Sequence, residues 1–179
     1  MRKALFLSCD PGRHGSIVHV KDSGVLHVTI GITSSSCKLH AYLKNLLDED
    51  RSLMRVAILE RTGGYVPGNS GPGAVKFARH CGMIEQALVC HEFAVYSVAP
   101  QSWMQRFASL EGIPYPIGDG DKKQRKAEIK RAVTALYSDV RLKVTLGNAD
   151  ALAMLHVLRD AYISGNVDAF MQLDKTRLQ

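Results

Sequence analysis

The sequence predicts an α/β fold in which a five-stranded mixed sheet carries helices on both faces. Three strand-like segments come first and are close enough to form hairpins, and helical and strand-like segments then alternate. Such an order is typical of a sheet that opens antiparallel and continues parallel. With 179 residues, 46% of them apolar, the chain can bury one full core, so we expect a single domain over residues 1–179.

Short apolar runs bounded by turn residues predict the strands. The five runs are residues 3–9, 15–21, 25–31, 54–60 and 93–98. Asp22-Ser23-Gly24 supplies the turn chemistry of a hairpin between the second run and the third. In a mixed sheet the first and fourth strands can lie side by side and parallel, and we expect this arrangement.

Apolar periodicity and helix-start residues predict five helices. They cover about residues 36–50, 72–92, 100–107, 121–137 and 148–163, and residues 110–120 are expected to form a loop. In the second helix, which Pro72 opens, we expect one set of residues to face inward: Val75, Ala78, Cys81, Ile84, Ala87 and Leu88. Trp103 and Phe107, one turn apart, are expected to be core residues rather than a base-stacking platform.

Carboxylates stand at the ends of three of these elements. Asp10 closes the first strand, Glu60 ends the fourth, and Asp150 lies at the start of the last helix. Three such acids in a basic protein indicate divalent-metal chemistry on a phosphodiester. Each acid also has a plain structural explanation: a turn after the first strand, an ion pair between Glu60 and Arg61, and an acid at a helix N-terminus behind Asn148 as N-cap.

A net charge of +6 and a pI near 9.2 favour a polyanionic partner. Basic residues concentrate between Asp121 and Arg131, although such a run can also be a solvated helix face. The glycine-rich segment 63–71 lacks the Gly-Lys-Ser/Thr ending of a phosphate-binding P-loop. Its small residues either let a nucleic-acid backbone come close or form an ordinary surface loop. The predicted DNA contacts are Lys76, Arg79, Lys122, Lys123, Arg125 and Lys126, with Tyr65 as a stacking residue.

Cysteine usage and hydropathy indicate a soluble protein of a reducing compartment. The four cysteines have neither disulfide-scaffold nor zinc spacing, and Cys9 and Cys81 are expected to be small core residues. The apolar run after the amino terminus is too short for a signal peptide, and no stretch approaches the roughly 18 residues that span a bilayer. We expect a cytoplasmic protein without a membrane partner.

Several segments together resemble the RuvC-type Holliday junction resolvases of the ribonuclease H-like superfamily, and most closely the short RuvC-like nucleases of phages and prophages. The resemblance spans roughly residues 3–163 in the order of that family. The matching segments are Phe6–Gly12 followed by Gly15, Val56–Glu60, Pro67-Gly68 with Phe77–Gly82, Val98–Trp103, Asp121-Lys122 and Ala149–Leu152.

The resemblance implies a ribonuclease H-like fold and a magnesium-dependent endonuclease that resolves four-way junctions or other branched DNA. Asp10, Glu60 and Asp150 would hold two Mg²⁺ ions about 4 Å apart, with Mn²⁺ as a substitute. It also implies a homodimer, with the helix over 72–92 as an interface element, in the cytoplasm of a bacterial or phage-infected cell.

The chain departs from that family at one position. Many resolvases have a further acid three residues before the last one, where this chain has Gly147, and some short relatives have a histidine one residue earlier, where it has Leu146. Asn148 is then the candidate for an additional oxygen ligand. Two alternatives stay open: a weakened or inactive nucleic-acid-binding module of the same fold, and an RNA-processing ribonuclease H-like nuclease. Sugar kinases and actin-like ATPases need a longer chain.

Overall fold

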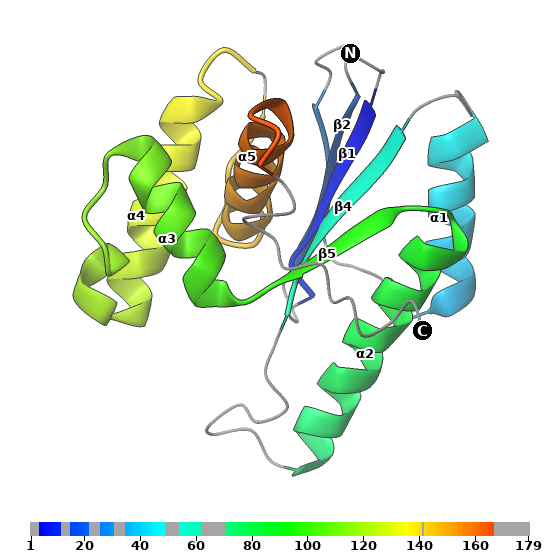
Figure 1. The fold of residues 1–179 in the computed structure, drawn as a ribbon. Helices are drawn as coiled ribbons and strands as arrows, with labels where there is room; N and C mark the ends of the chain where they lie inside the picture. Colours follow the sequence, from blue (N-terminus) through cyan, green and yellow to red (C-terminus); the bar gives the residue numbers. More distant parts are fainter. Residues whose placement is uncertain are drawn as a thin grey trace.

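A five-stranded sheet with strand order β3-β2-β1-β4-β5 forms the centre of the protein (Figure 1). The computed structural model describes residues 4–11, 15–21, 26–30, 35–48, 54–61, 71–140 and 142–166. The strands are β1 (Ala4–Cys9), β2 (Ser16–Lys21), β3 (Leu26–Ile30), β4 (Met54–Glu60) and β5 (Ala94–Val98). The first three pair antiparallel, and β4 and β5 continue the sheet in parallel, which confirms the predicted mixed sheet.

The pairing of β1 with β4 sets the position of the acids. Cys9 pairs with Leu59 in parallel register, so the residues that follow, Asp10 and Glu60, fall at the same edge of the sheet. All six residues of β1 are buried, because both faces of this central strand are covered. Its largely apolar sequence is the local cause of this position, and the half-buried Asp10 follows directly at its carboxyl end.

Helices cover both faces of the sheet, as predicted (Figure 1). One face packs against α3 (Pro100–Glu111), α4 (Lys122–Leu136) and α5 (Ala149–Ile163), and the other against α1 (Ser36–Asp48) and α2 (Gly71–Cys90). Successive β1 side chains alternate between the two cores: Phe6 joins the first, and Leu5 and Leu7 join the second. No helix among the described residues is long and apolar enough to cross a membrane.

The helix α2 differs from its prediction in the residues that it buries. Only Ile84, Ala87 and Leu88 are buried, whereas Ala78 is exposed, Val75 is 58% exposed and Cys81 is half-buried. The amino-terminal half of α2 runs on beyond the sheet, so it has no sheet face to cover (Figure 1). The expectation that Val75, Ala78 and Cys81 are core residues is therefore wrong, while Cys9 is buried as predicted.

The segment predicted as a loop between α3 and α4 contains a short 3-10 helix, η1 (Ile117–Gly120). Ile117 is buried in the same core as α3 and α5. Gly118 has a φ of +63° and packs closely on the backbone of α4 at Gln124 and Arg125. The loop therefore acts as a packed support for the first turns of α4.

Candidate active site

The three predicted acids line one pocket of about 520 Å³ at the carboxyl ends of β1 and β4. Asp10 follows β1, Glu60 is the last residue of β4, and Asp150 lies in the first turn of α5. The side chains of α3 and α4 close the pocket from the other sides, with Trp103, Met104, Arg125, Lys126 and Ile129 among its lining. The structure thus brings together acids that lie up to 140 residues apart in the sequence.

Backbone hydrogen bonds fix the two strand ends. The N–H of Asp10 donates to the carbonyl of Ser16 at 3.1 Å, which joins the end of β1 to the start of β2. Just after Glu60, the N–H of Arg61 donates to the carbonyl of Val98 at 2.7 Å and extends the β4–β5 ladder. Both acids therefore stand on rigid strand ends, a placement that suits a catalytic group.

Trp103 holds the carboxylate of Glu60. Its indole Nε1–H donates to Glu60 Oε2 at 2.8 Å, while the ring is buried in the core beneath the pocket. The predicted core position is confirmed, and the contact with Glu60 adds a polar role that sequence reasoning missed. The available signal was chemical: a buried indole N–H needs an acceptor.

Burial and like charge act on the carboxylates. Burial, together with the nearby charges of Asp10 and Asp150, raises the pKa of Glu60 to about 7, while the Trp103 hydrogen bond and Arg125 act in the opposite direction. Burial also raises the pKa of Asp150, and Lys126 is the strongest group opposing that shift. The three carboxylates therefore lie close enough to repel one another. A positive charge in the pocket would stabilise their ionised forms.

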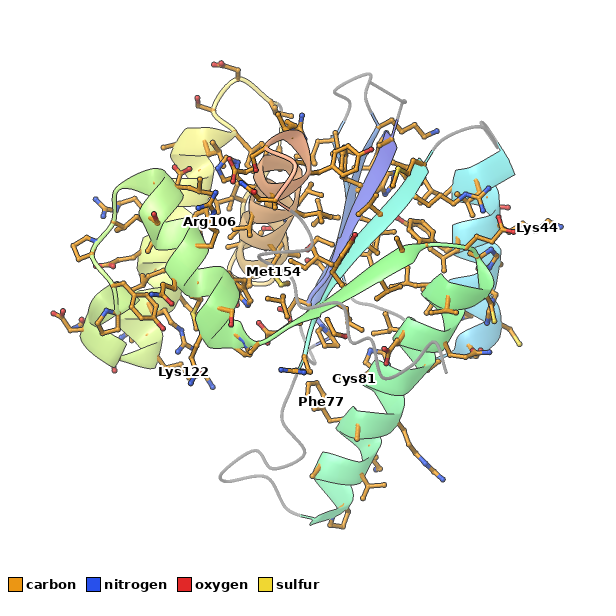
Figure 2. The ribbon with its side chains drawn as sticks, viewed as in Figure 1. Lys44, Phe77, Cys81, Arg106, Lys122 and Met154 are labelled. Atoms are coloured by element: carbon orange, nitrogen blue, oxygen red, sulfur yellow. The ribbon has the colours of Figure 1, made fainter. Side chains whose placement is uncertain are left out.

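Two of the predicted DNA contacts belong to this pocket. Lys126 Nζ lies 3.7 Å from Asp150 Oδ2, and Arg125 also lines the pocket. Lys122 and Lys123 are exposed on the first turn of α4, and Figure 2 shows Lys122 at that end of the helix.

The remaining predicted DNA contacts are not part of the pocket lining. Lys76 and Arg79 are exposed on α2, on the other side of the sheet. Tyr65 and the rest of residues 62–70 lie outside the described residues.

The amide of Asn148, the predicted additional ligand, is hydrogen-bonded within the turn before α5. Its Oδ1 accepts a hydrogen bond from the N–H of Thr145 at 2.7 Å, and its Nδ2 donates to the carbonyl of Lys143 at 3.1 Å. Its amide thus closes the turn that precedes α5 and makes no side-chain cap bond to that helix. The side chain is committed to the turn, and Gly147, which lines the pocket, has none to offer.

The donor set suits a hard divalent cation, because carboxylate oxygens are the ligands that Mg²⁺ prefers. Within the ranges that the structure describes, no three acidic, histidine or cysteine side chains converge closely enough to hold an ion as they stand. Mg²⁺ needs only one or two carboxylates together with waters, and direct coordination by all three acids would draw their side chains closer together. Trp103 and Lys126, which hold Glu60 and Asp150, are the contacts that this movement would change.

Neither a protein-family model nor a curated protein matches this chain. Two solved structures of RuvC from Thermus thermophilus are similar to it at 18% identity, each covering 90% of this chain and 97% of the other. The TM-score is 0.60 for the structure of RuvC in complex with a Holliday junction substrate and 0.57 for the other RuvC structure. At this identity the likeness shows the fold, so the predicted ribonuclease H-like architecture is confirmed.

Proposed function

We propose that this protein is a magnesium-dependent endonuclease that cleaves branched DNA, with the four-way junction as its substrate. The observation that supports this most is the acid pocket: Asp10, Glu60 and Asp150 meet at one sheet edge, beside basic side chains of α4. The fold is shared with a RuvC that was solved on a Holliday junction substrate. Acids for metal binding next to cations for phosphate binding suit phosphodiester hydrolysis.

Asp10, Glu60 and Asp150 would hold the Mg²⁺, and Mn²⁺ would substitute for it. A bound divalent cation would supply Lewis-acid stabilisation of the phosphate and a water of lowered pKa. Glu60 must be ionised to take part, and its pKa of about 7 in the ion-free pocket is one that a bound cation would lower. Trp103 favours the ionised form, because its N–H donates to the carboxylate and lowers that pKa.

The basic start of α4 would hold the DNA backbone next to the acids. Lys122 and Lys123 are exposed there, and Arg125 is half-buried at the pocket. Lys76, Arg79 and Tyr65 remain proposed contacts on the strength of the sequence alone. Long basic side chains on phosphates give affinity without reading sequence, as a junction nuclease requires. A homodimer would match the two-fold symmetry of the junction and place one pocket at each of two nicks.

The decisive experiment compares nicking of a synthetic four-way junction, a linear duplex and an RNA–DNA hybrid in Mg²⁺. We expect cleavage of the junction above all. Asp10→Asn should lower the rate to about 1% or less, because a lost metal ligand removes several kcal/mol of transition-state stabilisation. Junction binding by the variant should persist, since basic residues dominate affinity. Wild-type cleavage by Asp10→Asn would remove Asp10 from the site.

A nucleic-acid-binding module without activity is the second candidate. It is favoured by Gly147 in place of a further acid and by Lys126 already paired with Asp150. Tight junction binding without Mg²⁺-dependent nicking by the wild-type protein would favour this alternative. Preferred cleavage of the hybrid or of structured RNA would instead favour an RNA-processing nuclease.

A further inference from the structure

A positive charge is built into the acid pocket. Lys126, one turn into α4, approaches Asp150 at the start of α5 with Nζ 3.7 Å from Oδ2. The side chains of Lys126 and Asp150 are 36% and 17% exposed, so this contact lies at the pocket mouth rather than in open solvent. Among the forces on Asp150, Lys126 is the strongest that favours its ionised form.

The charge of the pocket lining limits how many cations it can hold. The charged lining residues are three acids, Asp10, Glu60 and Asp150, and two bases, Arg125 and Lys126. With all five ionised, the described lining of the DNA-free pocket has a formal charge of −1, which one divalent cation reverses to +1 and a second would raise to +3. Like charges repel strongly in a half-buried site, so a second divalent cation is disfavoured in the DNA-free pocket.

The ligand supply points the same way. Gly147 lines the pocket where a further acid would face the cations, and it has no side chain. Asn148, its neighbour, uses both polar atoms of its amide on Thr145 and Lys143. The side of the pocket next to Asp150 therefore lacks a further ligand and has an ammonium group in place of a second ion.

We propose that Lys126 supplies the positive charge that a second divalent cation would supply, so that each site holds one divalent cation. The proposal rests on the nuclease function proposed above. In that reaction the ammonium of Lys126 lies beside Asp150 and stabilises the negative charge that develops on the phosphate, as a fixed cation does in other phosphoryl-transfer sites. Lys126 then takes part in the chemical step by stabilising charge on the phosphate, in addition to any contact that holds DNA in place.

The first test counts ions without DNA. Equilibrium dialysis with Mn²⁺ at pH 8, above the pKa of about 7 of Glu60, should give one tightly bound ion per wild-type chain. Lys126→Gln should bind Mn²⁺ about tenfold more tightly, because a like charge next to Asp150 is gone. Lys44→Gln, an exposed lysine of α1 on the opposite side of the sheet (Figure 2), is the matched control and should leave Mn²⁺ binding unchanged.

The second test measures cleavage of the four-way junction at saturating Mg²⁺. Lys126→Gln should bind the junction and the metal yet cleave at least about tenfold more slowly. Thermal unfolding should match that of the wild type, because the ion pair is partly solvated. Two Mn²⁺ ions per wild-type chain, unchanged Mn²⁺ affinity in Lys126→Gln, or wild-type cleavage by that variant would each overturn the proposal.

The two proposals fail differently. If the wild type binds one Mn²⁺ and Lys126→Gln tightens it, but no nucleic acid is cleaved, the nuclease function is overturned and the cation assignment is supported. Both results come from dialysis without DNA, so they do not depend on finding the correct substrate.

Discussion

Trp103 joins the apolar core to the acid pocket through one side chain. Its ring is 2% exposed and its N–H reaches Glu60 Oε2. The hydrogen bond favours ionised Glu60 against burial and against the nearby charges of Asp10 and Asp150, all of which favour the protonated form. The pocket therefore depends on a core residue for the protonation state of one of its acids.

Trp103→Phe should separate these two roles. The variant keeps an aromatic ring but loses the donor, so the pKa of Glu60 should rise above about 7 and the pH–rate profile should move to higher pH. We also expect a loss of about 1–3 kcal/mol in the free energy of unfolding from lost packing. Phe107→Leu, in the same core, is the control and should destabilise without moving the profile. An unmoved profile in Trp103→Phe would contradict this role.

The raised pKa of Glu60 also predicts a pH dependence of stability in ion-free protein. Its pKa rises from an ordinary value of 4.5 to about 7, so between these values the folded state holds a proton that the unfolded chain has released. The free energy of unfolding should therefore fall as pH rises through this window, by up to about 3 kcal/mol from this group, and then level off. Glu60→Gln should flatten that part of a denaturation series. Identical pH curves for both proteins would contradict the shift.

The contact between η1 and α4 positions the basic side of the pocket. Gly118 combines a φ of +63° with a backbone approach so close that an added Cβ would lie 2.8 Å from the carbonyl carbon of Gln124. Its N–H donates to Glu128 Oε2 at 3.0 Å, and Asp121 caps α4 by accepting from the N–H groups of Lys123 and Gln124. These contacts set where α4 begins and hence where Arg125 and Lys126 lie.

Gly118→Ala should cost about 2–4 kcal/mol in the free energy of unfolding, from left-handed backbone strain plus a clash with α4. Gly112→Ala is a close control, because Gly112 has the same φ of +63° but nothing within 4 Å of an added Cβ. It should cost only about 1 kcal/mol. Urea denaturation of both variants measures the difference. Equal costs would mean that the close approach to α4 contributes nothing.

The sequence predicts a helix or strand well where the residue pattern is local. It predicts burial less well where the extent of a neighbouring element decides which residues are covered. The apolar runs of β1 and β4, each closed by an acid, predict two strands that can lie side by side, and the structure places Asp10 and Glu60 at the same edge. The periodicity of α2 could not show that its first half runs past the sheet, so Val75 and Ala78 were wrongly placed in the core. Apolar spacing gives a helix face, but it does not say how far the neighbouring sheet extends.

The same limit applies inside the pocket. The sequence marked Lys126 as one of several basic residues on α4, but its approach to Asp150 depends on how α4 packs against α5. Asn148 is a candidate ligand on the sequence because of the missing acid at Gly147, and the turn that uses both polar atoms of its amide cannot be seen there. Contacts between side chains that are distant in the sequence depend on tertiary packing, which the spacing of residues along the chain does not specify.

The molecule as a whole places the acid pocket at one sheet edge, and within the described ranges no helix or strand covers the first half of α2. Figure 1 shows α2 extending past the strands, and Val75 on this projecting part is 58% exposed. A second copy could cover that part of α2 across a two-fold axis, and two symmetric pockets would suit two symmetric nicks in a junction. We therefore expect a homodimer with α2 at its interface.

Val75→Asp should dissociate this dimer without unfolding the chain. Valine at an interface contributes apolar burial that a carboxylate removes, whereas an acid in the first turns of a helix is favourable for the helix itself. Sedimentation velocity should give twice the 19.7 kDa chain for the wild type and one chain for the variant, with unchanged circular dichroism. Val140→Asp, an exposed valine just after α4, is the control and should stay dimeric. A wild type that sediments as a monomer both free and on a four-way junction would contradict the dimer, and each nick would then need its own binding event.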